Sequence, residues 1–231
     1  MTKKINPISL RLGLSQVWEI AIQSYGKFNS CYVKFIFKQL QIEKTINRII
    51  YSNKFLIHDQ EFWYIENKLL LNIYFTELST NHLDKYLSLI KKLSKVIFNW
   101  FLVKISIKIY KRTNLITTTN LITNYALYLF AQNKNPNKVL WQICLFLKKH
   151  LNSYKIVYST QGIRLIYLKG FKVRIVGRFD NTKSQMAKSI QQSSGPMSLV
   201  SLKNHVEFIQ ETLYTKLGSC GLQIWLFYEI D

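Results

Sequence analysis

The sequence has 231 residues and a formal net charge of +20, from 32 Lys and Arg against 12 Asp and Glu. Hydrophobic residues make up 48% of the chain and aromatic residues 14%, which is enough for a sizeable core and excludes a chain that is disordered throughout. Such an excess of positive charge opposes compaction unless an anionic partner neutralises it. We therefore expect nucleic acid as the partner, with anionic lipid as the second possibility.

Catalytic and metal-binding patterns do not occur in the sequence. Neither the glycine-rich loops G-x-x-x-x-G-K-[ST] and G-x-G-x-x-G nor the zinc pattern H-E-x-x-H is present. The acidic residues are isolated, and Cys31, Cys144 and Cys220 lie far apart, so neither a disulfide framework nor a zinc site is indicated. We expect a binding protein without a metal or cofactor rather than an enzyme.

Residues 1–13 predict a short basic arm, in which Pro7 and Gly13 interrupt regular secondary structure. An arm of this kind suits insertion along a phosphate backbone, which would use Lys3, Lys4 and Arg11. The alternative is a frayed terminus. The N-terminus resembles neither a secretory signal nor an Arg- and Ser-rich presequence. If the protein acts in an organelle, we expect it to be made there, and its wealth of Lys, Asn, Ile and Phe is typical of an AT-biased genome.

The first half of the chain predicts the order helix, strands, helix, strand. Apolar residues recur at helical spacing in two stretches and alternate with polar ones in the others. The expected helices are 32–50 and 83–98, and the expected strands are 55–57, 62–65, 69–75 and 103–110. In the first helix we expect the apolar residues to face inward, namely Val33, Ile36, Phe37, Leu40, Ile46 and Ile50.

The second half begins near residue 113, so we expect two domains, residues 1–112 and 113–231. Helices are predicted at 121–132 and 137–151, and strands at 171–176 and 222–228. The stretch 153–169 fits either an extended helix or a β-hairpin. The charge-free run 113–133 holds too many Asn and Thr to cross a bilayer, so no membrane span is expected.

A basic strand followed by a polar loop marks the candidate binding region of the second half. Lys172 and Arg174 alternate with apolar residues, Arg178 follows the strand, and Lys183 and Lys188 lie in the loop expected at 180–194. Cations on a strand and an adjoining loop are typical of surfaces that hold a polyanion. With the arm, the expected RNA-binding residues are Lys3, Lys4, Asn6, Arg11, Lys172, Arg174, Arg178, Lys183 and Lys188.

Several motifs resemble a known family. They are Lys4-Ile5-Asn6-Pro7 with Arg11-Leu12-Gly13, then Gly170-Phe171-Lys172-Val173, Gly177-Arg178, Met186-Ala187-Lys188, Pro196-Met197-Ser198-Leu199, and Gly218-Ser219-Cys220-Gly221-Leu222-Gln223-Ile224-Trp225-Leu226-Phe227. In order and spacing they resemble the family of the third protein of the small ribosomal subunit. Because the first motif starts at residue 4, we also expect an intact natural N-terminus.

The resemblance implies a fold and a role. The fold would be α+β, with an N-terminal KH-like domain of type II and a C-terminal α/β domain of sandwich-like form. The role would be that of a structural protein of the subunit head, which binds rRNA, contacts neighbouring ribosomal proteins and lines the entry channel for mRNA. Residues 153–169 exceed the length usual in the family.

Departures from the family pattern favour a diverged mitochondrial member over a plastid one. A KH domain holds RNA through a Gly-x-x-Gly loop, because glycines let backbone amides approach phosphates. Here the stretch 76–82 contains no glycine and carries Glu77, so we expect this loop not to clamp RNA. The alternative functions are an organelle-encoded intron endonuclease, which would need clustered metal-binding carboxylates, or another basic nucleic-acid-binding protein.

Overall fold

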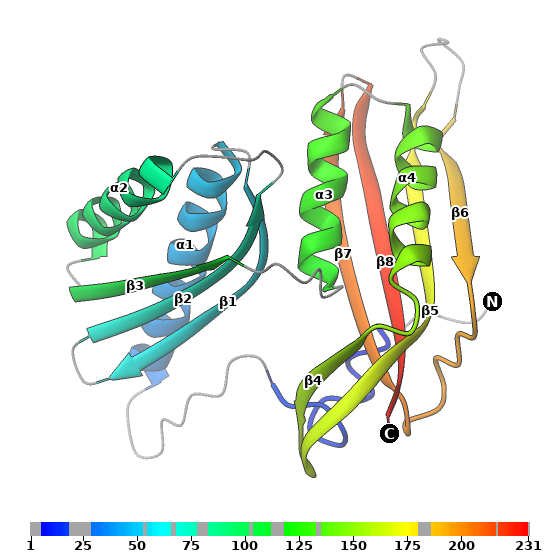
Figure 1. Cartoon of the computed structure of the whole chain (residues 1–231), viewed down its shortest axis with the longest axis horizontal. Coiled ribbons are helices and arrows are strands. Elements are labelled where there is room, and N and C mark those ends of the chain that lie inside the picture. The colour runs from blue at the N-terminus through cyan, green and yellow to red at the C-terminus, as the bar shows by residue number, and fades with distance from the viewer. Residues whose placement is uncertain are drawn as a thin grey trace. The chain divides into compact units, whose positions relative to one another are not determined.

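The computed structural model describes residues 6–18, 29–52, 55–65, 68–77, 83–101, 104–111, 118–132, 135–179, 186–215 and 217–230. Contacts divide the chain into two compact units. The larger unit combines Met1–Glu19 with Ile116–Asp231, and the smaller unit is Ile20–Leu115. Each unit is mixed α+β with a sheet of its own (Figure 1). The arm thus groups with the C-terminal residues and not with the N-terminal domain in which the sequence analysis placed it.

The smaller unit has the element order expected from the sequence. Its elements are α1 Asn29–Ser52, β1 Phe55–Ile65, β2 Lys68–Glu77, α2 Leu83–Phe101 and β3 Lys104–Lys111. Strand β2 is central; it pairs antiparallel with β1 and parallel with β3. A parallel partner cannot follow through a tight turn, and α2 provides the crossover. The two expected fragments at 55–57 and 62–65 are one strand, in which the register shifts between Ile57 and Gln60.

Helix α1 buries a different side from the one predicted. Ile42, Ile46 and Ile50 are at most 5% exposed and pack with the sheet and α2. Ile46 and Ile50 were expected there, but Val33 and Phe37 are 62% and 59% exposed. At 3.6 residues per turn, Phe37 lies on the opposite side of the helix from Ile46. The helix carries two apolar stripes, and only one of them contributes to the core.

The larger unit places two helices on one face of a five-stranded antiparallel sheet. Its elements are α3 Thr119–Ala131, α4 Pro136–Lys149, β4 Tyr154–Ser159, β5 Gly162–Gly177, β6 Lys188–Ser194, β7 His205–Thr215 and β8 Gly218–Ile230. The strand order is β4-β5-β8-β7, with β6 also paired to β5. Residues 153–169 therefore form a β-hairpin.

The prediction of a polar loop at 180–194 is wrong for the second half of this stretch. Residues Lys188–Ser194 form β6, an antiparallel partner of Phe171–Gly177. Polar residues suffice for this strand because most of its side chains are exposed and its backbone is paired along β5. Lys183 and the rest of 180–185 lie outside the described residues.

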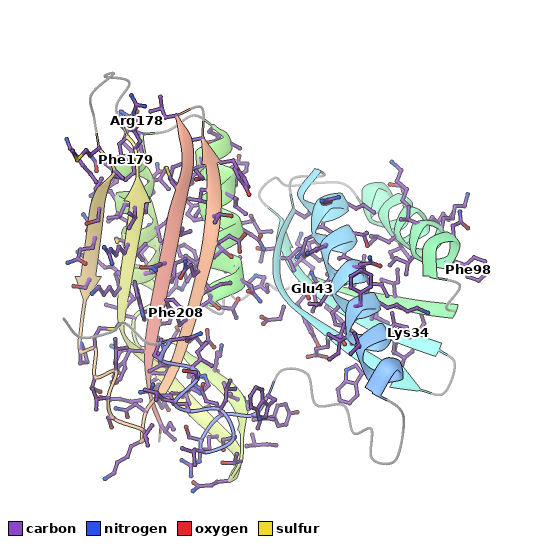
Figure 2. All side chains as sticks on the ribbon, turned by 180° about the vertical axis from the view of Figure 1, so that it is seen from behind. Lys34, Glu43, Phe98, Arg178, Phe179 and Phe208 are labelled. Atoms are coloured by element: carbon purple, nitrogen blue, oxygen red, sulfur yellow. The ribbon has the colours of Figure 1, made fainter. Side chains whose placement is uncertain are left out.

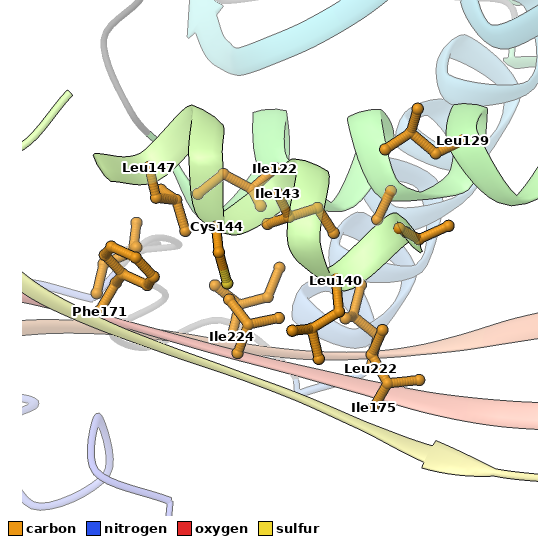
Figure 3. Packing of buried hydrophobic residues seen from close by; sticks show 14 of the residues in the cluster. Ile122, Leu129, Leu140, Ile143, Cys144, Leu147, Phe171, Ile175, Leu222 and Ile224 are labelled. Atoms are coloured by element: carbon orange, nitrogen blue, oxygen red, sulfur yellow. The ribbon is translucent and has the colours of Figure 1, made fainter. Parts of the chain in front are cut away.

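The core of the larger unit lies between the helices and the sheet (Figure 3). Ile122 and Leu129 come from α3, and Leu140, Ile143 and Leu147 from α4. Strands β5 and β8 supply the opposing layer, with Phe171, Val173, Ile175, Leu222, Ile224 and Leu226 fully buried. Pro136 starts α4 at a position where its missing N–H costs no hydrogen bond. The odd-numbered residues of β5 from Phe171 onward thus point to the helices, and Lys172 and Arg174 point away.

None of the helices in the described parts of the chain is long and apolar enough to cross a membrane.

Candidate nucleic-acid interface

The face of the larger sheet that is free of helices carries two cross-strand rows of polar and aromatic side chains. The register aligns Lys172 with Trp225 and Trp225 with Phe208. In the next row it aligns Arg174 with Gln223 and Gln223 with Gln210. We call these six residues the basic face. Figure 2 views the molecule from the side opposite to Figure 1 and labels Phe208 on β7.

Contacts within the basic face hold the side chains against one another. The Lys172 ammonium lies 5.4 Å from the centroid of the Trp225 ring, and the Phe208 and Trp225 rings are 5.1 Å apart. Gln223 donates from Nε2 to Oε1 of Gln210 at 3.3 Å. Among the described residues, the buried Nε of Arg174 has no hydrogen-bond partner.

This combination suits nucleic acid more than another ligand. Lys and Arg provide charge for phosphates, and a guanidinium matches phosphate geometry with paired donors. Trp225 and Phe208 offer aromatic surface against which an unpaired base can stack. The two glutamines add neutral donors and acceptors. The face therefore provides both contacts that a polynucleotide requires.

Two further predicted cations lie at the end of β5. Arg178 follows the strand directly, and Lys188 opens β6 opposite Gly177. Arg178 is half-buried and Lys188 is exposed. Figure 2 shows Arg178 and Phe179 together at this end of the sheet. The structure thus brings Lys172, Arg174 and Arg178 together, whereas Lys188 lies opposite Gly177, in line with the core residue Ile190, and points to the helix side of the sheet.

The arm corrects one predicted contact. Arg11 is 0% exposed, so it is not available to a phosphate. Its guanidinium donates to the carbonyl oxygens of Pro7, Leu199, Ser201 and Asn204 at 2.7–3.2 Å. Burial lowers the pKa of Arg11 below its ordinary value. Sequence reasoning treated every cation of the arm alike, because charge alone does not distinguish a surface arginine from one that binds backbone carbonyls.

Asn6 is exposed but serves a turn. Its Oδ1 accepts from the backbone N–H of Ile8 at 3.0 Å, and its carbonyl accepts from the Ser9 hydroxyl at 2.7 Å. This is the local pairing by which Asn side chains shape turns. Lys3 and Lys4 lie outside the described residues.

A charged network fastens the arm and the hairpin to β7. Lys155 of β4 pairs with Glu207, and Gln16 of the arm lies 3.0 Å from Nδ1 of His205 and donates to the Val206 carbonyl at 2.9 Å. Burial by itself would raise the pKa of Glu207, but the Lys155 ammonium and a hydrogen bond with His205 lower it from 4.5 to about 2. The pair is structural, since both partners are satisfied within the protein.

Comparison with known proteins identifies the family. The chain is 40% identical over 228 residues to the small ribosomal subunit protein uS3m of Chondrus crispus, across 99% of this chain and 94% of that protein. This chain belongs to the uS3 family.

A second relative in the uS3 family is more distant. The small ribosomal subunit protein uS3c of Euglena longa is 33% identical over 81 residues, which is 35% of this chain and 36% of that protein. No protein-family model matches the chain. Among the described residues, no group of three or more His, Cys, Asp or Glu side chains is placed to hold a metal ion.

Sequence reasoning missed the aromatic half of the basic face. The alternation of β8 puts Gln223 and Trp225 on the face of the sheet away from Leu222 and Ile224. Once β8 is known to pair with β5, this alternation predicts that Gln223 and Trp225 share a face with Lys172. Phe208 had no such signal. Strand β7 does not alternate cleanly, because the arm covers Val206 near one end while Ile209 packs toward the helices.

The sheet of the smaller unit also has a face without helices. Trp63, Leu70, Asn72, Ser106, Lys108 and Tyr110 line a half-open cavity of about 240 Å³. The Tyr74 and Tyr110 rings stack 5.3 Å apart at this face. Of the stretch expected not to clamp RNA, Thr76 and Glu77 end β2, and residues 78–82 lie outside the described parts of the chain.

Proposed function

We propose that this chain occupies the head of the small ribosomal subunit, binds rRNA through its basic face and helps to line the channel by which mRNA enters. The alignment of Lys172, Trp225 and Phe208 beside Arg174 carries the proposal. Two cations beside two neighbouring aromatic rings favour a nucleic acid over a protein partner. Arg178 extends the same surface past the end of β5.

The broader function follows from the family. The chain is a structural protein of the mitochondrial ribosome and not an enzyme. Its partners are rRNA and other ribosomal proteins. The net charge of +20 agrees with that setting, because the phosphates of rRNA supply the countercharge that the chain lacks.

We also propose that the smaller unit is a KH domain of type II whose RNA-clamping loop is degenerate. Its order of helix, two antiparallel strands, helix and a third strand parallel to the second supports this. The absence of glycine between residues 76 and 82 supports the loss of the clamp. The larger unit would be the C-terminal α/β domain of the family.

Competitive incorporation into small subunits tests the proposal. A tagged chain with Lys172→Glu and Arg174→Glu competes with the unaltered chain, and mass spectrometry reads the ratio in purified subunits. Lys148→Glu with Lys149→Glu is the matched control, because both lysines are exposed at the end of α4 in the same unit. We expect the first pair to be depleted and the control to incorporate almost normally. Equal incorporation would place the RNA surface elsewhere.

A further inference from the structure

The hairpin of β4 and β5 has one face built only from apolar and aromatic side chains. The register pairs Tyr154 with Tyr167, Ile156 with Leu165 and Tyr158 with Ile163. Directly opposed residues of an antiparallel pair project from the same face. All six side chains therefore share one face, which we call the hairpin face. Figure 1 shows the two strands continuing as a ribbon beyond the end of α4.

The hairpin face is exposed to an unusual degree. Tyr154, Ile156, Tyr158 and Ile163 are 65%, 66%, 74% and 68% exposed. Single exposed apolar side chains are common on soluble proteins, but a contiguous group of this size marks an interaction surface. Strand β4 is also an edge of its sheet, and edges are normally protected by charged residues. The hairpin face has none.

The opposite face of the hairpin holds it in place. Lys155 pairs with Glu207 and lies 5.3 Å from the Tyr228 ring, while Val157 packs on the core and Ile166 is 1% exposed. The turn is fixed as well, since the Thr160 hydroxyl donates to the Leu14 carbonyl at 2.8 Å. The hairpin face is thus presented on an anchored support. A surface that is already ordered loses less entropy when a partner binds.

Charge decides what kind of partner the hairpin face fits. A polyanion would need cations, and the nearest lysine on the strand, Lys155, points the other way and is paired. A second copy of this chain would bring another +20 against the first. The partner surface must therefore be uncharged, apolar and part of a different molecule.

We propose that the hairpin face docks on an apolar surface of a neighbouring protein of the small subunit. This inference rests on the chain's place in that subunit and adds a protein contact to the RNA contact of the basic face. The two surfaces bind different partners, since the cations of the basic face contact phosphates and the uncharged hairpin face contacts protein. Tyr154, Tyr158 and Tyr167 supply the large, rigid rings that dominate protein interfaces.

A photo-crosslink identifies the partner. Benzoylphenylalanine replaces Tyr158 in the full chain, which is incorporated into mitochondrial small subunits and irradiated. Tyr214, 84% exposed on β7, is the control position. We expect a protein adduct at Tyr158 that survives ribonuclease, and none with the same protein at Tyr214. An adduct with RNA, with a second copy of this chain, or with nothing would overturn the inference.

Charge substitutions give an independent test. Tyr158→Lys and Tyr158→Glu compete with the unaltered chain for incorporation, beside the controls Trp141→Lys and Trp141→Glu, since Trp141 is 57% exposed on α4 and lies in the helical layer. Both Tyr158 variants should lose roughly fivefold in incorporation, since a residue that matters at an interface contributes about 1 kcal/mol or more. A loss with Glu but a gain with Lys would indicate RNA, and no loss with either would indicate a solvent-facing hairpin; both refute the docking surface. If the unaltered chain itself does not enter the subunit, the proposed function fails instead.

Discussion

Arg11 holds the arm to the larger unit through backbone carbonyls. Its guanidinium reaches four carbonyl oxygens, of which three belong to residues between Leu199 and Asn204. A lysine has the same charge but only a single ammonium, which cannot reproduce this spread of donors. The role of Arg11 is therefore geometric, and the shape of its side chain matters more than its charge.

Arg11→Lys should destabilise the larger unit. Each buried carbonyl that loses its donor costs about 1–3 kcal/mol, so the variant should melt well below the unaltered chain. Thermal unfolding followed by circular dichroism measures this. Lys203→Met serves as the control, because Lys203 is an exposed cation next to the same carbonyls. If both variants melt like the unaltered protein, Arg11 does not anchor the arm.

Glu207 makes stability depend on pH in an acid window. Its folded pKa of about 2 lies below its ordinary value of 4.5, so the folded state holds this proton less tightly than the unfolded state does. The resulting stabilisation is complete above pH 4.5 and is lost as the pH falls toward 2. Its size is on the order of 3 kcal/mol at neutral pH.

Glu207→Gln should remove most of this acid dependence and lower stability at pH 7. Urea unfolding at several pH values between 2 and 7 provides the measurement. Glu211→Gln is the control on the same strand, where the side chain is exposed. A Glu207→Gln chain that keeps the full loss of stability between pH 4.5 and 2 would show that another carboxyl controls it.

At the scale of elements, strand β5 depends on a close crossing of the chain near Gly170. The pairing of β5 with β8 shifts register between Leu168 and Gly170, and the residues after β6 pass directly over this point. A Cβ at Gly170 would overlap the carbonyl oxygen of Pro196, and Gly195 has a φ of +79°. Gly170 and Gly195 thus permit one contact between backbones.

Gly170→Ala should therefore displace β6 or the segment that follows it. Because the overlapping atom belongs to the backbone, we expect a loss of about 1–3 kcal/mol, as for overpacked cores. Gly221→Ala is the matched control on β8, where a Cβ would meet only the Val176 carbonyl at 3.9 Å. Chemical denaturation of both variants compares them, and equal midpoints would contradict the crossing.

An element could be predicted from the sequence only where the spacing of its apolar residues shows which face is buried. Helix α2 and strands β2, β3 and β8 were predicted because a single buried face imposes one period on their sequence. For 153–169 a β-hairpin and an extended helix stayed open as alternatives, since apolar residues occur on both faces of this stretch and fit a helix as well as two strands. Strand β6 was missed because its polar side chains reflect exposure, while the pairing that makes it a strand lies in its backbone.

The residues of the candidate site were likewise predictable only in part. Lys172 and Arg174 were found from charge and alternation alone. Phe208 and Trp225 were not found, since their place beside Lys172 depends on which strands are neighbours in the sheet. The sequence of a single strand does not show which strands pair with it. Arg11 was assigned to the surface because its carbonyl partners lie nearly 200 residues further along the chain.

At the scale of the whole molecule, the net charge of +20 requires a partner that supplies negative charge over a wide area. Lys172, Arg174 and Arg178 gather on one region of the larger unit, whereas Lys148 and Lys149 lie in the helical layer. Binding to rRNA should therefore release counterions, and its strength should fall steeply with salt.

We expect the affinity of the full chain for a fragment of small-subunit rRNA to fall roughly a thousandfold between 50 and 200 mM salt, which corresponds to about six neutralised phosphates. Lys172→Glu with Arg174→Glu should weaken binding and reduce the slope of log affinity against log salt by about 1.5, because two phosphate contacts are lost. Lys148→Glu with Lys149→Glu changes the net charge equally and should leave the slope nearly intact. Filter binding across a salt series distinguishes the two variants. Equal slopes would mean that the chain attracts RNA by its total charge and not by its basic face.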